Sequence, residues 1–122
     1  DYGRNEYADS FRFEHALFLA STVMSVGDGS RCIVDAGLKS LAVDSGLPQV
    51  WAEPGLAYAA ANDEHGIVRA AVPGASLPAL GSQLRLVPGH CDPTLNLHDE
   101  LLAYRGKRVE AVWRIAARGL SR

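Results

Sequence analysis

The chain has 122 residues, 48% apolar and 21% charged, and its 12 Lys and Arg against 14 Asp and Glu give a net charge of −2. These values are typical of one globular domain. A near-neutral balance without a basic cluster argues against nucleic acid or an anionic membrane surface as the main partner. No apolar run approaches the roughly 18 residues of a membrane span, so we expect no membrane partner either.

The start of the chain and its cysteines suggest what kind of molecule this is. The first residue is Asp1 and the only methionine is Met24, so we expect a processed chain or one domain of a longer protein. Polar and aromatic residues fill 1–12, which we expect to be a linker, and the domain itself should cover 13–122. The two cysteines, Cys32 and Cys91, favour reduced thiols in a cytoplasmic protein over a disulfide framework.

Short apolar bursts bounded by Gly, Pro, Asn and Asp follow along the chain, a pattern typical of strands joined by turns. The alternation over 109–115 indicates a half-buried strand. The run over 16–26 is long and contains poor helix formers, so we expect a bent strand there. In chain order, the expected strands cover 16–26, 31–36, 56–61, 67–72, 83–87, 101–105 and 108–115, the last of which contains the alternating residues 109–115.

Turns complete the predicted fold. Residues 62–66 and 105–107 each supply a glycine between two strands and predict hairpins. Short helical turns are expected over 38–43 and over 94–99, the latter behind Pro93. The predicted fold class is therefore mainly β, an antiparallel barrel-like or sandwich-like domain with one or two short helical turns.

The densest group of reactive side chains lies in the loop over 88–94, where prolines and a glycine restrict the backbone. If this loop is extended, His90 and Asp92 point to the same side and Cys91 to the other. An imidazole and a carboxylate on one face can share a divalent cation, with the remaining coordination positions open to water or substrate. The alternative is a loop histidine paired with an aspartate, without a metal.

For the other polar residues, a structural role is expected rather than a catalytic or metal-binding one. The turn over 63–65 is expected to be solvated, and Asp35 and Lys39, which flank a glycine, are expected to form an ion pair at a strand end. His15 and His98 lie beside apolar residues and are expected to be partly buried structural histidines. The sequence contains no Ser/His/Asp order, phosphate loop or four-ligand zinc pattern.

Several blocks of the sequence, in order, resemble the bacterial D-threonine aldolases and their relatives, the D-serine dehydratases. Each block is short, but together they span essentially the whole chain. With the opening DYGRN, they are VDAGLKSLAVDSGLP over 34–48, DEHG over 63–66, VPGHCDPTLNL over 87–97 and IAARG over 115–119.

The resemblance implies a domain organisation. In such enzymes an N-terminal (β/α)₈ barrel of the alanine-racemase type holds pyridoxal phosphate on a lysine, and a C-terminal β domain closes the active site and supplies a metal. This chain would be that C-terminal domain, with 1–12 as the linker from the absent barrel. Neither Lys39 nor Lys107 would then be the cofactor lysine.

The resemblance also implies a metal site. The family's metal pair falls on His90 and Asp92; the second ligand is a cysteine in the zinc-dependent dehydratases and an aspartate in the aldolases. Asp92 therefore favours an aldolase and a harder ion, Mn²⁺ first, with Mg²⁺ or Co²⁺ as alternatives. Glu64 and His65 are candidates to contact the metal-bound ligands or waters. We name no catalytic residue in this chain.

The implied reaction is retro-aldol cleavage of a D-β-hydroxy-α-amino acid to glycine and an aldehyde, carried out by a homodimer and not by this chain alone. Two alternatives stay open. One is a D-serine or 3-hydroxyaspartate dehydratase, which would release a keto acid and ammonia. The other is a non-catalytic β module that binds a partner through an exposed apolar patch.

Overall fold

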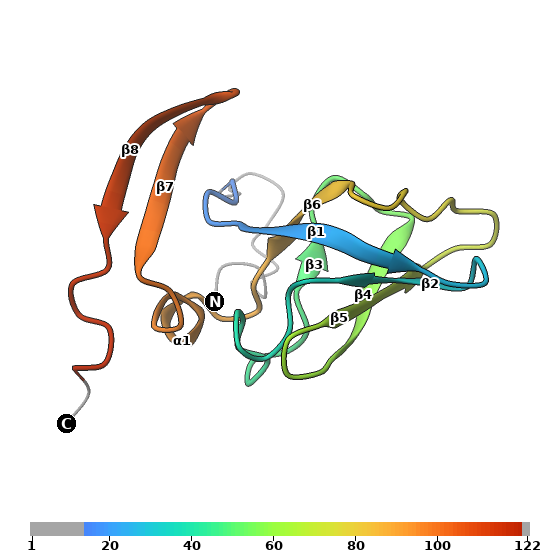
Figure 1. The fold of residues 1–122 in the computed structure, drawn as a ribbon, viewed down its shortest axis with the longest axis horizontal. Coiled ribbons are helices and arrows are strands. Elements are labelled where there is room, and N and C mark those ends of the chain that lie inside the picture. Colours follow the sequence, from blue (N-terminus) through green and yellow to red (C-terminus); the bar gives the residue numbers. More distant parts are fainter. Residues whose placement is uncertain (1–13, 121–122) are drawn as a thin grey trace, which may run out of the picture.

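The computed structural model describes residues 14–120 of the chain. Six antiparallel strands form one sheet in the order β3–β6–β1–β2–β5–β4. The strands β3 and β4, at the two ends of this order, contact each other, so the sheet nearly closes into a barrel (Figure 1). These strands are β1 (Leu19–Val26), β2 (Arg31–Val34), β3 (Gln49–Val50), β4 (Leu56–Ala61), β5 (Gly66–Ala70) and β6 (Gln83–Val87). The predicted fold class is confirmed.

The strand β1 connects the two halves of the barrel. Its first half pairs with β6 and its second half with β2, with a register shift between Val23 and Ser25. An irregularity of this kind bends a strand, in agreement with the bend that the sequence predicted. Alternate side chains point inward, and the largest fully buried apolar side chains are those of Val23, Val34, Leu41, Val68 and Leu86.

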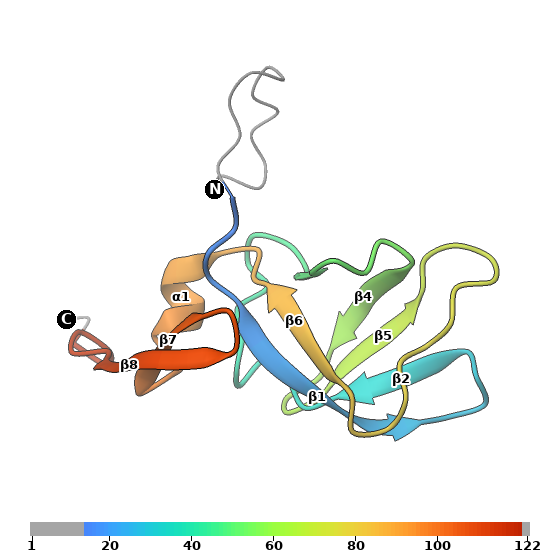
Figure 2. The same ribbon diagram turned by 90° about the horizontal axis from the view of Figure 1, so that it is seen from above.

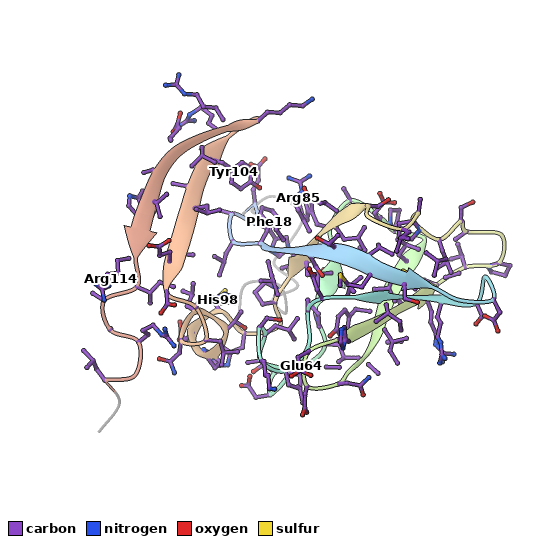
Figure 3. The ribbon with its side chains drawn as sticks, viewed as in Figure 1. Phe18, Glu64, Arg85, His98, Tyr104 and Arg114 are labelled. Atoms are coloured by element: carbon purple, nitrogen blue, oxygen red, sulfur yellow. The ribbon has the colours of Figure 1, made fainter. Side chains whose placement is uncertain are left out.

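A hairpin of β7 (Glu100–Arg105) and β8 (Arg108–Arg114) stands apart from the barrel (Figures 1 and 2). Gly106, with φ of 61°, makes the turn between them, as predicted. Tyr104 points toward Arg85, whose Nη1 lies 3.5 Å from the tyrosine hydroxyl (Figure 3). The strand predicted over 109–115 is present as β8, but its predicted half-burial is wrong, because within residues 14–120 no element covers its faces and Trp113 is 59% exposed.

The remaining predicted elements differ at their ends. The strands over 56–61 and 83–87 have the expected bounds, and the others shift by at most three residues at an end. The two-residue strand β3 was not predicted. The first of the two predicted helical turns, over 38–43, is a turn over 38–40. The second, predicted over 94–99, is the helix α1 (Cys91–Leu95), which begins three residues earlier.

Two further predictions concern membrane spans and the domain boundary. Within residues 14–120, no helix is long and apolar enough to cross a membrane. The linker predicted over 1–12 lies outside the described residues, so the domain boundary stays a prediction.

Candidate metal site

His90 and Asp92 lie where β6 passes into α1. His90 is the residue before the helix and has an extended backbone, whereas Asp92 is in the first turn of the helix. The expected extended loop over 88–94 is therefore wrong in its second half. Pro93 explains the difference, because its fixed φ and missing N–H are well tolerated in the first turn of a helix. The two side chains still face each other, with His90 Nε2 3.9 Å from Asp92 Oδ2.

The second ring nitrogen of His90 has a partner that the sequence did not suggest. Nδ1 lies 2.7 Å from Oδ2 of Asp44, a residue 46 positions earlier in the chain. The Ser45 hydroxyl donates to the same carboxylate oxygen at 3.1 Å. The hydrogen bond to His90 is the main cause that lowers the pKa of Asp44 below its ordinary value. In the sequence, Asp44 is one polar residue in a Ser- and Gly-containing turn, and only the fold brings it to His90.

Asp44 belongs to the connection between β2 and β3, residues 35–48, which we call the 35–48 loop. The buried side chain of Thr94 joins this loop to α1: its hydroxyl donates to the His90 carbonyl at 2.7 Å and accepts from the Ala42 amide at 3.1 Å. Beside it, a Cβ on Gly89 would lie only 2.4 Å from the Gly46 carbonyl oxygen. The segment carrying Asp44 is therefore packed directly against the segment carrying His90.

The other end of the 35–48 loop packs on the turn between β4 and β5. A Cβ on Gly37 would lie 2.4–2.6 Å from backbone atoms of that turn, so only glycine fits there without a shift. The Lys39 ammonium pairs with Glu64 in the same turn. The expected pair of Asp35 with Lys39 is wrong, because Asp35 instead accepts hydrogen bonds from β1, from the Ser21 hydroxyl at 2.8 Å and the Thr22 amide at 2.7 Å.

The segments over 63–66 and 87–97, two blocks of the sequence motif, both pack on the 35–48 loop. Their polar side chains nevertheless do not form one cluster. Glu64 lies at the β4–β5 turn (Figure 3), and the hydrogen bond from Lys39 is the main cause that lowers its pKa. The ion pairs and hydrogen bonds within residues 14–120 join Glu64 to Lys39 and not to His90 or Asp92. A role of Glu64 or His65 beside a metal stays a prediction.

The histidines and cysteines outside the pair have structural surroundings. His98 Nε2 lies 2.7 Å from the Ser40 carbonyl oxygen, which ties the end of the α1 segment to the 35–48 loop. His15 contacts the Trp51 ring edge-on, with 5.5 Å between ring centroids. Cys32 is buried in the core, Cys91 is exposed, and no disulfide joins them.

The two donors of the pair lie close enough to share one divalent ion after a small side-chain adjustment. Metal–nitrogen and metal–oxygen bonds of about 2.1 Å each limit two shared donors to a separation of about 4.2 Å. The 3.9 Å between His90 Nε2 and Asp92 Oδ2 lies within that limit, and the two atoms must approach to about 3.0–3.4 Å to bind one ion at octahedral or tetrahedral angles. Within residues 14–120 no three His, Cys, Asp or Glu side chains converge to hold a metal. An ion on this pair would therefore take its other ligands from water, substrate or another part of the protein.

Comparison with known proteins identifies the family. The family model described as a serine dehydratase domain matches residues 16–104, which include both the 35–48 loop and the His90–Asp92 pair. The chain belongs to this family. The resemblance drawn from the sequence motifs is thereby confirmed.

Two similar curated proteins are aldolases. The chain is 54% identical over 122 residues to the D-threonine aldolase of Arthrobacter sp and covers 32% of that protein. It is 44% identical to the 3-hydroxy-D-aspartate aldolase of Paracoccus denitrificans, with 98% of this chain and 31% of that protein covered. The chain thus spans about a third of the length of these relatives.

Solved structures of related enzymes contain the same fold as this chain. The crystal structure of D-threonine aldolase from Filomicrobium marinum matches 98% of this chain and 33% of that chain, with 41% identity and a TM-score of 0.89. D-threo-3-hydroxyaspartate dehydratase matches 80% of this chain and 31% of that chain, with 27% identity and a TM-score of 0.67, in a cysteine-to-alanine variant in the metal-free form. The same domain fold therefore occurs in an aldolase and in a dehydratase.

Proposed function

We propose that this chain is the metal-bearing C-terminal domain of a D-threonine aldolase-like lyase that depends on pyridoxal phosphate and a divalent metal. The whole enzyme would cleave D-β-hydroxy-α-amino acids to glycine and an aldehyde. The observation that carries the proposal is the His90–Asp92 pair, in which Nε2 and a carboxylate oxygen face each other at 3.9 Å. The 54% identity to a D-threonine aldolase over the whole chain supports the substrate class.

The residues of this chain have defined tasks in such an enzyme. His90 and Asp92 hold the ion, and Asp92, with its side chain 93% exposed, presents it toward solvent, where a substrate can reach it. The ion, when bound, supplies a Lewis acid that orients the substrate's β-hydroxyl and lowers its pKa. The carboxylate at position 92 favours a hard ion, and we propose Mn²⁺, with Mg²⁺ or Co²⁺ as alternatives.

The partners we propose follow from the same assignment. Pyridoxal phosphate, held by an N-terminal barrel, supplies the electron sink for Cα–Cβ cleavage. The relatives are about three times as long as this chain, which leaves room for such a barrel. The exposed apolar side chains of Leu102, Val112 and Trp113 on the β7–β8 hairpin suit packing against another part of a larger, homodimeric, cytoplasmic enzyme.

A dehydratase is the second candidate, because a solved dehydratase shares the domain. That dehydratase has been solved with a histidine and with a cysteine replaced, two positions apart, the same spacing as His90 and Asp92 here. Asp92, in place of a cysteine, is the feature that favours the aldolase. A non-catalytic binding module is the third outcome, and it requires no metal at His90.

Product analysis tests the proposal. We expect the longer enzyme, supplied with Mn²⁺ and pyridoxal phosphate, to convert D-threonine to glycine and acetaldehyde. The 122-residue chain alone should show no turnover. A keto acid and ammonia as products would indicate the dehydratase. Turnover by the isolated chain would contradict the assignment of the cofactor lysine to another domain.

A further inference from the structure

We propose that Asp44 is a positioning residue of the metal site: its carboxylate accepts the Nδ1 proton of His90 and so leaves Nε2 unprotonated and aimed at the ion. This inference rests on the proposed metal site at His90 and Asp92. Metal-binding histidines commonly donate their second ring N–H to a carboxylate, which fixes the tautomer and the ring orientation.

The chemistry of the hydrogen bond decides the tautomer. A neutral imidazole has one N–H donor and one nitrogen lone pair, and an ionised carboxylate can only accept. The Nδ1–Oδ2 distance of 2.7 Å therefore places the proton of His90 on Nδ1. Nε2 then presents its lone pair toward Asp92 Oδ2 at 3.9 Å. Two electron-rich atoms that face each other in this way are stabilised by a cation between them.

The placement of Asp44 is built into the backbone around it. Gly46 has φ of 111°, a conformation that only glycine adopts readily, and its carbonyl contacts Gly89, the residue before His90. The Thr94 hydroxyl joins the Ala42 amide to the His90 carbonyl. Contacts on both sides of Asp44 therefore fix its segment relative to His90, although the carboxylate itself is 53% exposed.

The tautomer provides a test that requires no turnover. In the metal-free 122-residue chain, at a pH where the imidazole is neutral, ¹⁵N NMR should show His90 protonated on Nδ1. Asp44→Ala should convert it to a mixture of tautomers without disturbing the rest of the spectrum. The matched control is Asp28→Ala, which removes an exposed turn aspartate whose partner is Ser30. A wild-type His90 protonated mainly on Nε2 would overturn the inference.

Metal affinity provides the second readout. Electron paramagnetic resonance of free Mn²⁺ measures binding, and Asp44→Ala should weaken it about 10- to 100-fold, while Asp28→Ala should not change it. Loss of binding in His90→Ala with full binding in Asp44→Ala would overturn the role of Asp44 and leave the metal site standing. Equal binding by wild type and His90→Ala would instead overturn the metal site and with it the role of Asp44 toward an ion, and the tautomer measurement would then decide only whether Asp44 sets the tautomer of His90.

Discussion

The close approach of two glycines beside the candidate site gives a sharp prediction for Gly89→Ala. An alanine Cβ there would lie 2.4 Å from the Gly46 carbonyl oxygen and 3.1 Å from its carbonyl carbon, both backbone atoms that no rotamer change can move. Gly89 itself has no positive φ, so an alanine meets only a steric penalty. Ordinary contact begins at 3.4 Å, so the Gly46 segment must move by about 1 Å.

That displacement has a calculable effect on the site. A shift of about 1 Å that carries Asp44 away from His90 would lengthen their 2.7 Å contact by up to about 1 Å, beyond the roughly 3.2 Å limit of a hydrogen bond. Overpacking of this kind costs about 1–3 kcal/mol. At roughly 4 °C per kcal/mol for a domain of this size, the melting temperature should fall by about 4–12 °C.

Thermal unfolding monitored by circular dichroism measures the first effect, and Mn²⁺ titration measures the second. Gly27→Ala is the matched control, because its Cβ would meet only the Arg31 carbonyl oxygen, at 4.0 Å. A Gly89→Ala chain that melts within about 1 °C of wild type and binds Mn²⁺ equally well would refute the reasoning.

Further predictions concern buried hydrogen bonds and the ligand at position 92. The Tyr58 hydroxyl donates to the buried Ala36 carbonyl, and burial raises the pKa of Tyr58 to about 12. In denaturant titrations the stability advantage of wild type over Tyr58→Phe should therefore fall by about 2 kcal/mol as the pH rises from 10 to 12. Below pH 10 the advantage should be constant, and an advantage unchanged at pH 12 would contradict this. Thr94→Val should destabilise the chain by about 1–2 kcal/mol in the same assay, since two partly buried backbone groups, the Ala42 amide and the His90 carbonyl, lose their partner. Asp92→Cys should shift the preference from Mn²⁺ toward Zn²⁺ in competition titrations, and an unchanged preference would argue against Asp92 as a ligand.

The strands were predictable because their signals are local. Alternating apolar residues over 83–87 and the glycine turn at 106 specify a strand and a hairpin without knowledge of the rest of the chain. The exposure of β8 was not predictable in the same way. Its alternation indicates a face that something covers, and no element among residues 14–120 covers it.

The candidate site could be predicted only in part, because some of its contacts join residues that are far apart in the sequence. His90 and Asp92 are two residues apart, so their side chains lie close together even though Asp92 is helical and the loop is not extended as predicted. Asp44 is 46 positions away from His90, and the pairing depends on the packing of the 35–48 loop. Lys39 likewise pairs with Glu64, 25 positions away, and not with the nearby Asp35. Long-range polar pairs of this kind have no signature in one sequence.

The central claim is that His90 and Asp92 hold the divalent ion of a D-β-hydroxy-α-amino acid lyase. The most direct test treats the longer enzyme with a chelator and follows glycine release from D-threonine as Mn²⁺ is returned. Wild type and Asp28→Ala should recover fully, whereas His90→Ala and Asp92→Ala should bind less Mn²⁺ and recover little or no activity. Full recovery of both site variants at the wild-type Mn²⁺ concentration would contradict the claim.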